Sequence, residues 1–147
     1  MLKSYLSNFD TIDDIIDKDE FINSNLNSDG SLSIYIGEIK NFPNLDPRIN
    51  IDEILCLRYN KGVGFKKHTH IKITDNHLGD IIIFPPSSLS PFKGGDLIIY
   101  HEDRTEIIKT DNLTEWKIVE LKLGVPHEVT EIEEGIRYSF KFDLFSE

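Results

Sequence analysis

The sequence predicts a mainly β domain, a sandwich or a barrel, with a helical layer at its N-terminus. From residue 31 onward, short apolar or alternating stretches follow one another, separated by glycine, proline and asparagine. This spacing is typical of antiparallel sheets. No stretch of helical length lies between the segments, which disfavours a parallel α/β sheet. The 147 residues suit a single domain, with the helical layer over 1–30 and the β core over 31–147.

The N-terminal 30 residues are expected to be helical. Their apolar side chains recur at mixed steps of three and four residues, which is the period of a helix with one buried face. Asn8 or Asp10 could cap a first helix and Asp19 a second turn, and the polar stretch 25–30 ends the layer. The apolar positions are Tyr5, Leu6, Phe9, Ile12, Ile15, Ile16, Phe21 and Ile22.

Nine strands are expected after this layer. The first alternates apolar and polar residues, the second is a dense apolar run, and the third alternates around a pair of histidines. Two prolines end the fourth strand, and two glycines lead into the fifth. The expected ranges are 31–39, 54–59, 65–74, 80–84, 96–100, 106–109, 116–123, 126–132 and 136–144.

The last expected strand has two chemically different faces. Alternation places Ile136, Tyr138, Phe140, Phe142 and Leu144 on one face and Arg137, Ser139, Lys141 and Asp143 on the other. Two interpretations of the polar face stay open. It is an exposed edge, or Arg137 and Ser139 line a ligand cavity while the apolar face packs under the N-terminal helices.

Composition excludes several classes of function. The net charge is -10, and no block of lysines or arginines stands out, which argues against binding to nucleic acid or to anionic membranes. The single cysteine, Cys56, lies in an apolar run, is expected to be buried, and cannot form an internal disulfide. We expect no signal peptide, because residues 1–10 lack a continuous apolar stretch, and no apolar run is long enough to span a bilayer. We therefore expect a soluble, cytoplasmic protein.

Three histidines and an arginine are the strongest functional signal. His68 and His70 are two apart on an expected strand, so their side chains share one face. His127, from a distant strand, could complete one facial cap on a metal ion. Arg137 could hold a carboxylate in two parallel hydrogen bonds. The combination predicts a metal site that binds an acidic co-substrate.

The flanking residues carry a resemblance to a known family. Tyr59 and a glycine-containing turn precede the His68-Thr69-His70 triplet, and the stretch 92–97 contains Gly-Gly-Asp-Leu. The stretch 124–139 contains His127 and Arg137. In order and spacing, these segments resemble those of the 2-oxoglutarate- and iron(II)-dependent oxygenases, in the prolyl 4-hydroxylase-like branch. The resemblance covers roughly residues 54 to 145.

This resemblance implies a fold and a metal centre. The fold would be a double-stranded β-helix, a small jelly roll, with the metal inside its open end. His68 and His127 would bind iron(II). The family carries an aspartate where this chain has His70, so the third ligand would be an imidazole instead of a carboxylate.

The resemblance also implies a co-substrate and a reaction. Arg137 would pair with the distal carboxylate of 2-oxoglutarate, Ser139 would add a hydroxyl hydrogen bond, and Tyr59 would lie near the co-substrate. The protein would then be a dioxygenase, an oxidoreductase that consumes 2-oxoglutarate and O2, with ascorbate as a candidate reductant. The primary substrate would be a side chain of a protein or peptide, with proline as one candidate.

Because of His70, two other functions stay open. One is a catalytically degenerate, metal-binding jelly-roll module. The other is a cupin-like dioxygenase with a three-histidine iron, because Gly62 and the histidine pair resemble half of the first cupin motif. Asp75 stands near the place of that motif's glutamate, although on an unbroken strand it would face away from the histidine pair. His77 and His101 lie near expected turns, and both are expected to be exposed to solvent.

Overall fold

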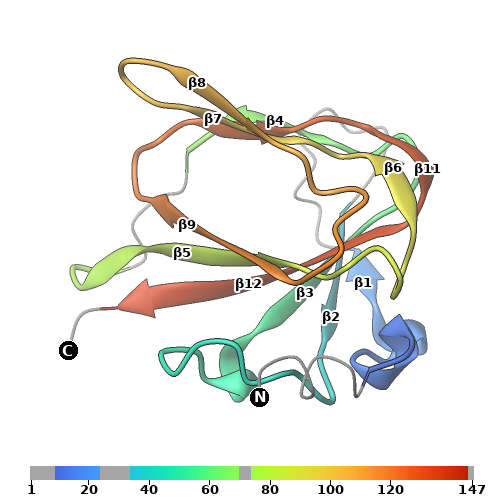
Figure 1. Ribbon diagram of the computed structural model, residues 1–147. Helices are drawn as coiled ribbons and strands as arrows, with labels where there is room; N and C mark the ends of the chain where they lie inside the picture. Colours follow the sequence, from blue (N-terminus) through green and yellow to red (C-terminus); the bar gives the residue numbers. More distant parts are fainter. Residues whose placement is uncertain (1–8, 24–33, 70–73, 146–147) are drawn as a thin grey trace.

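The chain folds into antiparallel sheets, in agreement with the expected mainly β class. The computed structural model, shown in Figure 1, describes residues 9–23, 34–69 and 74–145. Helical structure among these residues is limited to three short 3-10 turns, η1 (Ile12–Asp14), η2 (Lys18–Glu20) and η3 (Ile51–Glu53). None of the helical turns in this part of the chain is long and apolar enough to cross a membrane.

The largest sheet has six strands. Along the sheet they run in the order β1-β2-β3-β12-β5-β9, and every neighbouring pair is antiparallel. The strands are β1 (Ile22–Asn23), β2 (Tyr35–Glu38), β3 (Leu55–Tyr59), β5 (His77–Phe84), β9 (Lys117–Lys122) and β12 (Arg137–Phe145).

A second sheet of four strands lies opposite the first, and a pair of strands spans one end between them (Figure 1). The order in the second sheet is β4-β10-β7-β8, and β6 pairs with β11. These strands are β4 (Phe65–His68), β6 (Phe92–Gly94), β7 (Leu97–Tyr100), β8 (Thr105–Ile108), β10 (His127–Val129) and β11 (Ile132–Gly135).

The order of the eight central strands is that of a jelly roll. If β3, β4, β5, β7, β8, β9, β10 and β12 are counted one to eight, the large sheet contains strands 1-8-3-6 and the smaller one 2-7-4-5. Successive strands therefore alternate between the two facing sheets until the chain turns back, as in two interlocked Greek keys. The space between the sheets is where the inward faces of β4, β10 and β12 meet.

The prediction of N-terminal helices is wrong for the residues that the structure describes. Residues 9–23 form η1, η2 and β1, and Ile16 pairs with Ile39 in an isolated bridge. The carbonyl of Ile15 accepts a hydrogen bond from the amide of Lys40 at 2.8 Å, so this backbone bonds across to another segment instead of along a helix. Residues 1–8 and 24–30 of the expected layer lie outside the described residues.

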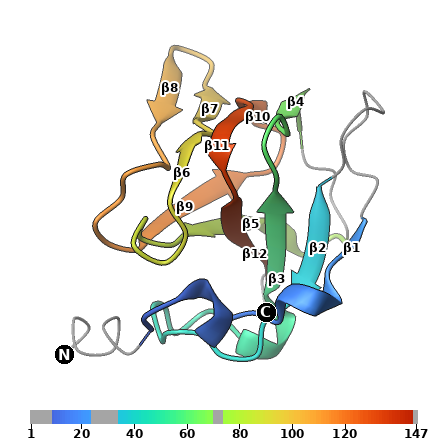
Figure 2. The same cartoon turned by 90° about the vertical axis from the view of Figure 1, so that its right-hand side faces the viewer.

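The same N-terminal segment nevertheless covers the large sheet, as expected. Its buried isoleucines pack against the outward face of β12, and Figure 2 shows these turns on the side of the sheet away from the second sheet. This outer core contains Ile12, Ile15, Ile16, Phe42, Ile54, Cys56, Ile81, Ile83, Leu89, Tyr138, Phe140 and Phe142. The mixed three- and four-residue steps therefore predicted the burial of Ile12, Ile15 and Ile16 correctly, although the backbone that presents them is not a regular helix. Ile22, by contrast, is 67% exposed, and Tyr5 and Leu6 lie outside the described residues.

A second core fills the space between the facing sheets. It contains Ile34, Tyr59, Val63, Phe84, Leu97, Ile99, Val119, Leu121, Val129 and Ile132. Because β12 lies between β3 and β5, its polar face is not a sheet edge, and Arg137 and Ser139 are each only 2% exposed. The exposed-edge interpretation of that face is therefore wrong.

Candidate functional site

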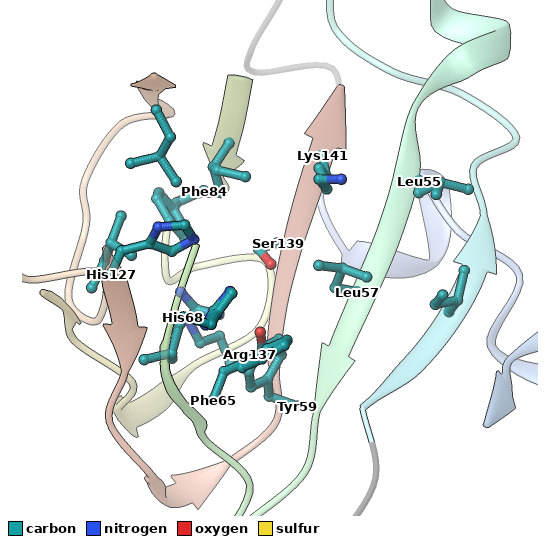
Figure 3. A pocket seen from close by; sticks show the side chains of 15 residues that line it. Leu55, Leu57, Tyr59, Phe65, His68, Phe84, His127, Arg137, Ser139 and Lys141 are labelled. Atoms are coloured by element: carbon teal, nitrogen blue, oxygen red, sulfur yellow. The ribbon is translucent and has the colours of Figure 1, made fainter. Parts of the chain in front are cut away.

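Two of the three predicted metal ligands lie side by side. His68 ends β4 and His127 begins β10, and the two residues face each other in the register of these strands. Their ring centroids are 4.4 Å apart with the ring planes at 60°. His127 is 4% exposed, and Figure 3 shows both rings on the wall opposite β12. Residues separated by nearly sixty positions are thus brought together by one antiparallel pairing.

Hydrogen bonds to the backbone fix the orientation of both rings. Nδ1 of His68 lies 2.7 Å from the carbonyl oxygen of Lys66, and Nδ1 of His127 lies 3.0 Å from that of Val125. A carbonyl oxygen only accepts, so Nδ1 carries the proton in each neutral ring and Nε2 carries the lone pair. Metal-binding histidines are commonly oriented in this way. Phe65 stacks on the His68 ring at 3.8 Å between centroids and restricts it further.

The third predicted ligand, His70, lies outside the described residues, so its part in a metal site stays a prediction. Asp75, considered as a substitute carboxylate, is exposed to solvent. The donor set that the structure does describe is a pair of imidazoles. Such nitrogen donors suit iron(II) and also zinc, copper and nickel.

Arg137 is buried at the start of β12 without an ion-pair partner among the described residues. Its guanidinium Nε donates a hydrogen bond to Oγ1 of Thr110 at 3.2 Å, and the group lies over the rings of Tyr59 and Phe84, 4.8 and 4.9 Å from their centroids. Asp96 acts on it only at longer range, since that carboxylate pairs with Lys109 at 2.9 Å. A buried charge with no counter-ion is costly. The site therefore favours an anionic ligand.

Burial is the largest influence on the pKa of Arg137 and on that of its neighbour Tyr59. Burial lowers the pKa of Arg137, and hydrogen bonding and charge attraction with Tyr59 act in the opposite direction. Burial also raises the pKa of the Tyr59 hydroxyl, while the positive charge of Arg137 counteracts that rise. An arginine stays protonated in proteins. At neutral pH the pocket floor therefore presents a cation beside a neutral phenol.

A glycine makes room for the arginine. An added Cβ at Gly95 would lie 2.8 Å from Cδ of Arg137 and 2.6 Å from Cδ1 of Ile132. The backbone there has φ +68°, which also favours glycine. The carbonyl of Gly95 accepts a hydrogen bond from Thr110 Oγ1 at 2.6 Å, and that hydroxyl oxygen in turn accepts a hydrogen bond from Arg137 Nε. The sequence placed Gly95 in the glycine pair that leads into an expected strand but gave no signal for Thr110.

The two histidines and Arg137 line one cavity of about 330 Å³ between the sheets (Figure 3). His68 and His127 lie on one wall, and Arg137, Ser139 and Lys141 follow one another along β12 on the other. The rest of the lining is largely apolar: Ile36, Leu55, Leu57, Tyr59, Phe65, Ile82, Phe84, Leu97, Leu121 and Val129. The space combines a histidine pair, a buried cation and an apolar wall, which suits a metal with an anionic organic ligand.

Outside this cavity, the prediction of an exposed His77 is wrong. His77 was expected to be exposed, but it is 3% exposed and bonds to Asp80. A register shift at the start of β5 turns its ring inward, and periodicity alone could not reveal this. His101 is partly exposed and pairs with Glu106 at 2.9 Å.

Comparisons of the sequence with known proteins do not identify a family for this chain. No family model and no curated protein matches the chain. Among solved structures, a Pseudomonas putida prolyl-4-hydroxylase aligns with 64% of this chain at 19% identity and a TM-score of 0.49. An oxidoreductase of the 2OG-Fe(II) oxygenase family from Burkholderia pseudomallei aligns with 61% at 14% identity and 0.48. The Drosophila melanogaster CENP-C cupin domain aligns with 97% at 7% identity and 0.48.

The aligned segment covers 53% and 41% of the two oxygenase chains and 92% of the cupin domain. At this level of similarity, neither the activities nor the ligands of these proteins transfer to this chain. The geometry of the cavity is therefore the basis for assigning a function.

Proposed function

We propose that this protein is an iron(II)- and 2-oxoglutarate-dependent dioxygenase built on a double-stranded β-helix. Its substrate would be a side chain of a protein or peptide, with a prolyl residue as the first candidate. The observation that carries the proposal is the buried Arg137 with no ion-pair partner among the described residues, in the same cavity as His68 and His127. A histidine pair alone would suit many metal proteins, but this arginine calls for a carboxylate ligand beside the metal.

Each residue has a distinct task in this proposal. His68 and His127 would hold the iron through Nε2, and His70 is the proposed third ligand. Arg137 would receive the distal carboxylate of 2-oxoglutarate, with the Ser139 hydroxyl beside it. Bound iron supplies the activation of O2 that couples decarboxylation of 2-oxoglutarate to hydroxylation.

The chain itself supplies orientation and a dry environment. The carbonyls of Lys66 and Val125 hold the imidazole rings, and Thr110 and Gly95 hold the guanidinium. The apolar lining excludes water, which strengthens the pairing between the guanidinium and a carboxylate.

The first test measures turnover of the co-substrate. Purified protein reconstituted with iron(II) and ascorbate should convert 2-oxoglutarate to succinate, and Arg137→Ala should abolish this turnover. Arg48→Ala is the matched control, because Arg48 pairs with Asp46 and Glu120 outside the cavity. Absence of turnover with every divalent metal tried, together with no stabilisation by 2-oxoglutarate, would overturn the proposal.

A second candidate is a metal-binding jelly-roll module without oxygenase activity. It is favoured by the imidazole at position 70, which removes a negative charge from the family's usual ligand set. Metal and 2-oxoglutarate would then stabilise the protein without forming succinate. Gain of turnover in His70→Asp would show that the native site is degraded.

A cupin-like dioxygenase is distinguished by the arginine. If a three-histidine iron acted without 2-oxoglutarate, Arg137→Ala would keep most of the activity on its substrate. Oxygen consumption that does not require 2-oxoglutarate would support this alternative.

A further inference from the structure

A second group of metal-binding side chains lies on the large sheet, apart from the histidine pair. It consists of His77 and Asp80 of β5 and Asp143 of β12. Each residue offers one ligand atom, and these atoms all lie within 4.8 Å of one another. His77 and Asp80 are 3% and 1% exposed, and the Asp143 side chain is 31% exposed. Buried ionisable side chains are rare in proteins unless they are paired or bind a metal ion.

A β-bulge brings the imidazole to the two carboxylates. Gly79 is paired with Leu144 and His77 with Phe145, so Leu78 is an extra residue in β5. On a regular strand, residues three apart point to opposite faces. The extra residue places His77 on the same face as Asp80, and Nε2 of His77 lies 3.1 Å from Oδ1 of Asp80. Bulges often re-aim a side chain in this way beside functional sites.

The two carboxylates face each other directly. Asp80 and Asp143 are register partners on neighbouring strands, and like charges at such positions are destabilising. Nζ of Lys141 lies 3.0 Å from Oδ1 of Asp143, but that oxygen is buried and receives no hydrogen bond. The ammonium therefore offsets the charge of Asp143 without saturating the oxygen as an acceptor. The pair is suited to accept a stronger cation.

We propose that His77, Asp80 and Asp143 form a second binding site, for a divalent transition metal such as Zn²⁺. Tetrahedral zinc with ligands at about 2.0–2.2 Å separates its donor atoms by roughly 3.3–3.6 Å. The His77 nitrogen and the Asp80 oxygen already lie close to that separation, and no separation in the group exceeds 4.8 Å. An aspartate side-chain rotation can close the remaining difference.

Charge also favours this assignment. Two carboxylates carry the charge that one divalent ion neutralises, so a metal would replace both the hydrogen bond between His77 and Asp80 and the ion pair between Lys141 and Asp143. Three protein ligands leave the fourth coordination position for water. Water can reach it on the side of Asp143, which is the most exposed of the three ligands.

The position of the site suggests its role. Asp143 continues the row of Arg137, Ser139 and Lys141 along β12. The metal would therefore lie on the same strand as Arg137 but at the other end of this row. It would tie the start of β5 to the end of β12. This site is independent of the proposed oxygenase activity, since it shares no ligand with the histidine pair.

The test separates the two sites by stoichiometry. In the double variant His68→Ala/His127→Ala, isothermal titration with Zn²⁺ and metal analysis should still find one bound zinc per chain. Adding Asp143→Asn should weaken that binding by about 10- to 100-fold or more. Loss of an outer-sphere partner already costs that much at a metal site, and Asp143 would be a direct ligand. Adding Asp103→Asn instead should change nothing, because Asp103 is an exposed acid that contacts Arg104.

A second variant tests the competition with lysine. Lys141→Gln removes the ammonium that the zinc would displace, so zinc affinity should increase, and circular dichroism checks that each variant is folded. The inference is overturned if the double variant binds no zinc, if Asp143→Asn binds zinc as well as Asp103→Asn does, or if Lys141→Gln leaves the affinity unchanged. These results do not depend on succinate formation, so this site and the proposed oxygenase can fail separately.

Discussion

At the level of single residues, the proposed 2-oxoglutarate site depends on Gly95, which makes room for Arg137 without contacting the co-substrate itself. An added methyl group at Gly95 would meet the Arg137 side chain at 2.8 Å. Gly95→Ala should therefore move the guanidinium and weaken the stabilisation by 2-oxoglutarate in a thermal-shift measurement. It should also destabilise the fold by about 1–2 kcal/mol, because φ there is +68°.

Gly124→Ala provides the matched control for that prediction. Gly124 has φ +80°, and a Cβ there would meet nothing within 4 Å. The two variants should share the backbone strain, whereas only Gly95→Ala should lose the response to 2-oxoglutarate. Equal loss in both variants would mean that the effect comes from general destabilisation.

Cys56 gives a prediction about pH. The residue is fully buried, and burial raises the pKa of its thiol, so the native protein should not react with Ellman's reagent at pH 8. Because the folded pKa is above the unfolded one, the stability associated with this proton is complete below the unfolded value of about 8.5 and decreases as the pH rises above it. One thiol per chain should react in denaturant, and rapid labelling without denaturant would contradict the burial.

At the scale of secondary-structure elements, alternation in the sequence predicted most strands because one face of each is buried. The two faces of β12 are an example, since Tyr138 packs in the outer core while Arg137 faces the cavity. Features that depend on long-range pairing were not predictable. The bulge that buries His77 and the backbone bonds that keep Ile15 out of a helix both come from partners distant in the sequence.

The predicted site was recoverable from sequence only in part, for the same reason. His68, His127 and Arg137 stand in a recognisable order, and the structure brings them to one cavity. Thr110 has no local pattern around it and reaches the arginine only through the fold. A hydroxyl two residues beyond a short, largely exposed strand carries no signal until its partner is known.

The N-terminal segment should contribute strongly to stability although it is not helical. Ile16 is 1% exposed against the outward face of the large sheet, so Ile16→Ala should cost about 2–5 kcal/mol of unfolding free energy. Ile22→Ala is the control, because Ile22 is 67% exposed and should lose little. Urea denaturation measures both. A loss below about 1 kcal/mol for Ile16→Ala would show that the segment is not an integral part of the domain.

At the scale of the whole molecule, the large sheet serves two cores at once. Its outward face is covered by the N-terminal segment, and its inward face carries the polar groups of the cavity. The outer core can therefore hold β12 rigidly while its other face is left for ligands. This arrangement lets the protein bury Arg137 with no ion pair to any described residue, because packing on the opposite face offsets the stability that the charge costs.

This arrangement predicts opposite effects of one substitution on stability and on binding. Arg137→Met removes a buried charge and keeps an unbranched side chain against Tyr59 and Phe84, so the ligand-free protein should unfold at the same or a higher temperature. In the native protein, 2-oxoglutarate at 100 times its dissociation constant should add about 2.7 kcal/mol of stability. In Arg137→Met that increment should vanish. Arg58→Met, which removes an arginine stacked on Phe21 and Tyr35 outside the cavity, should keep it. If Arg137→Met instead lowers the unfolding temperature of the ligand-free protein, the guanidinium is a structural element of the fold and its role as a carboxylate receptor loses its main support.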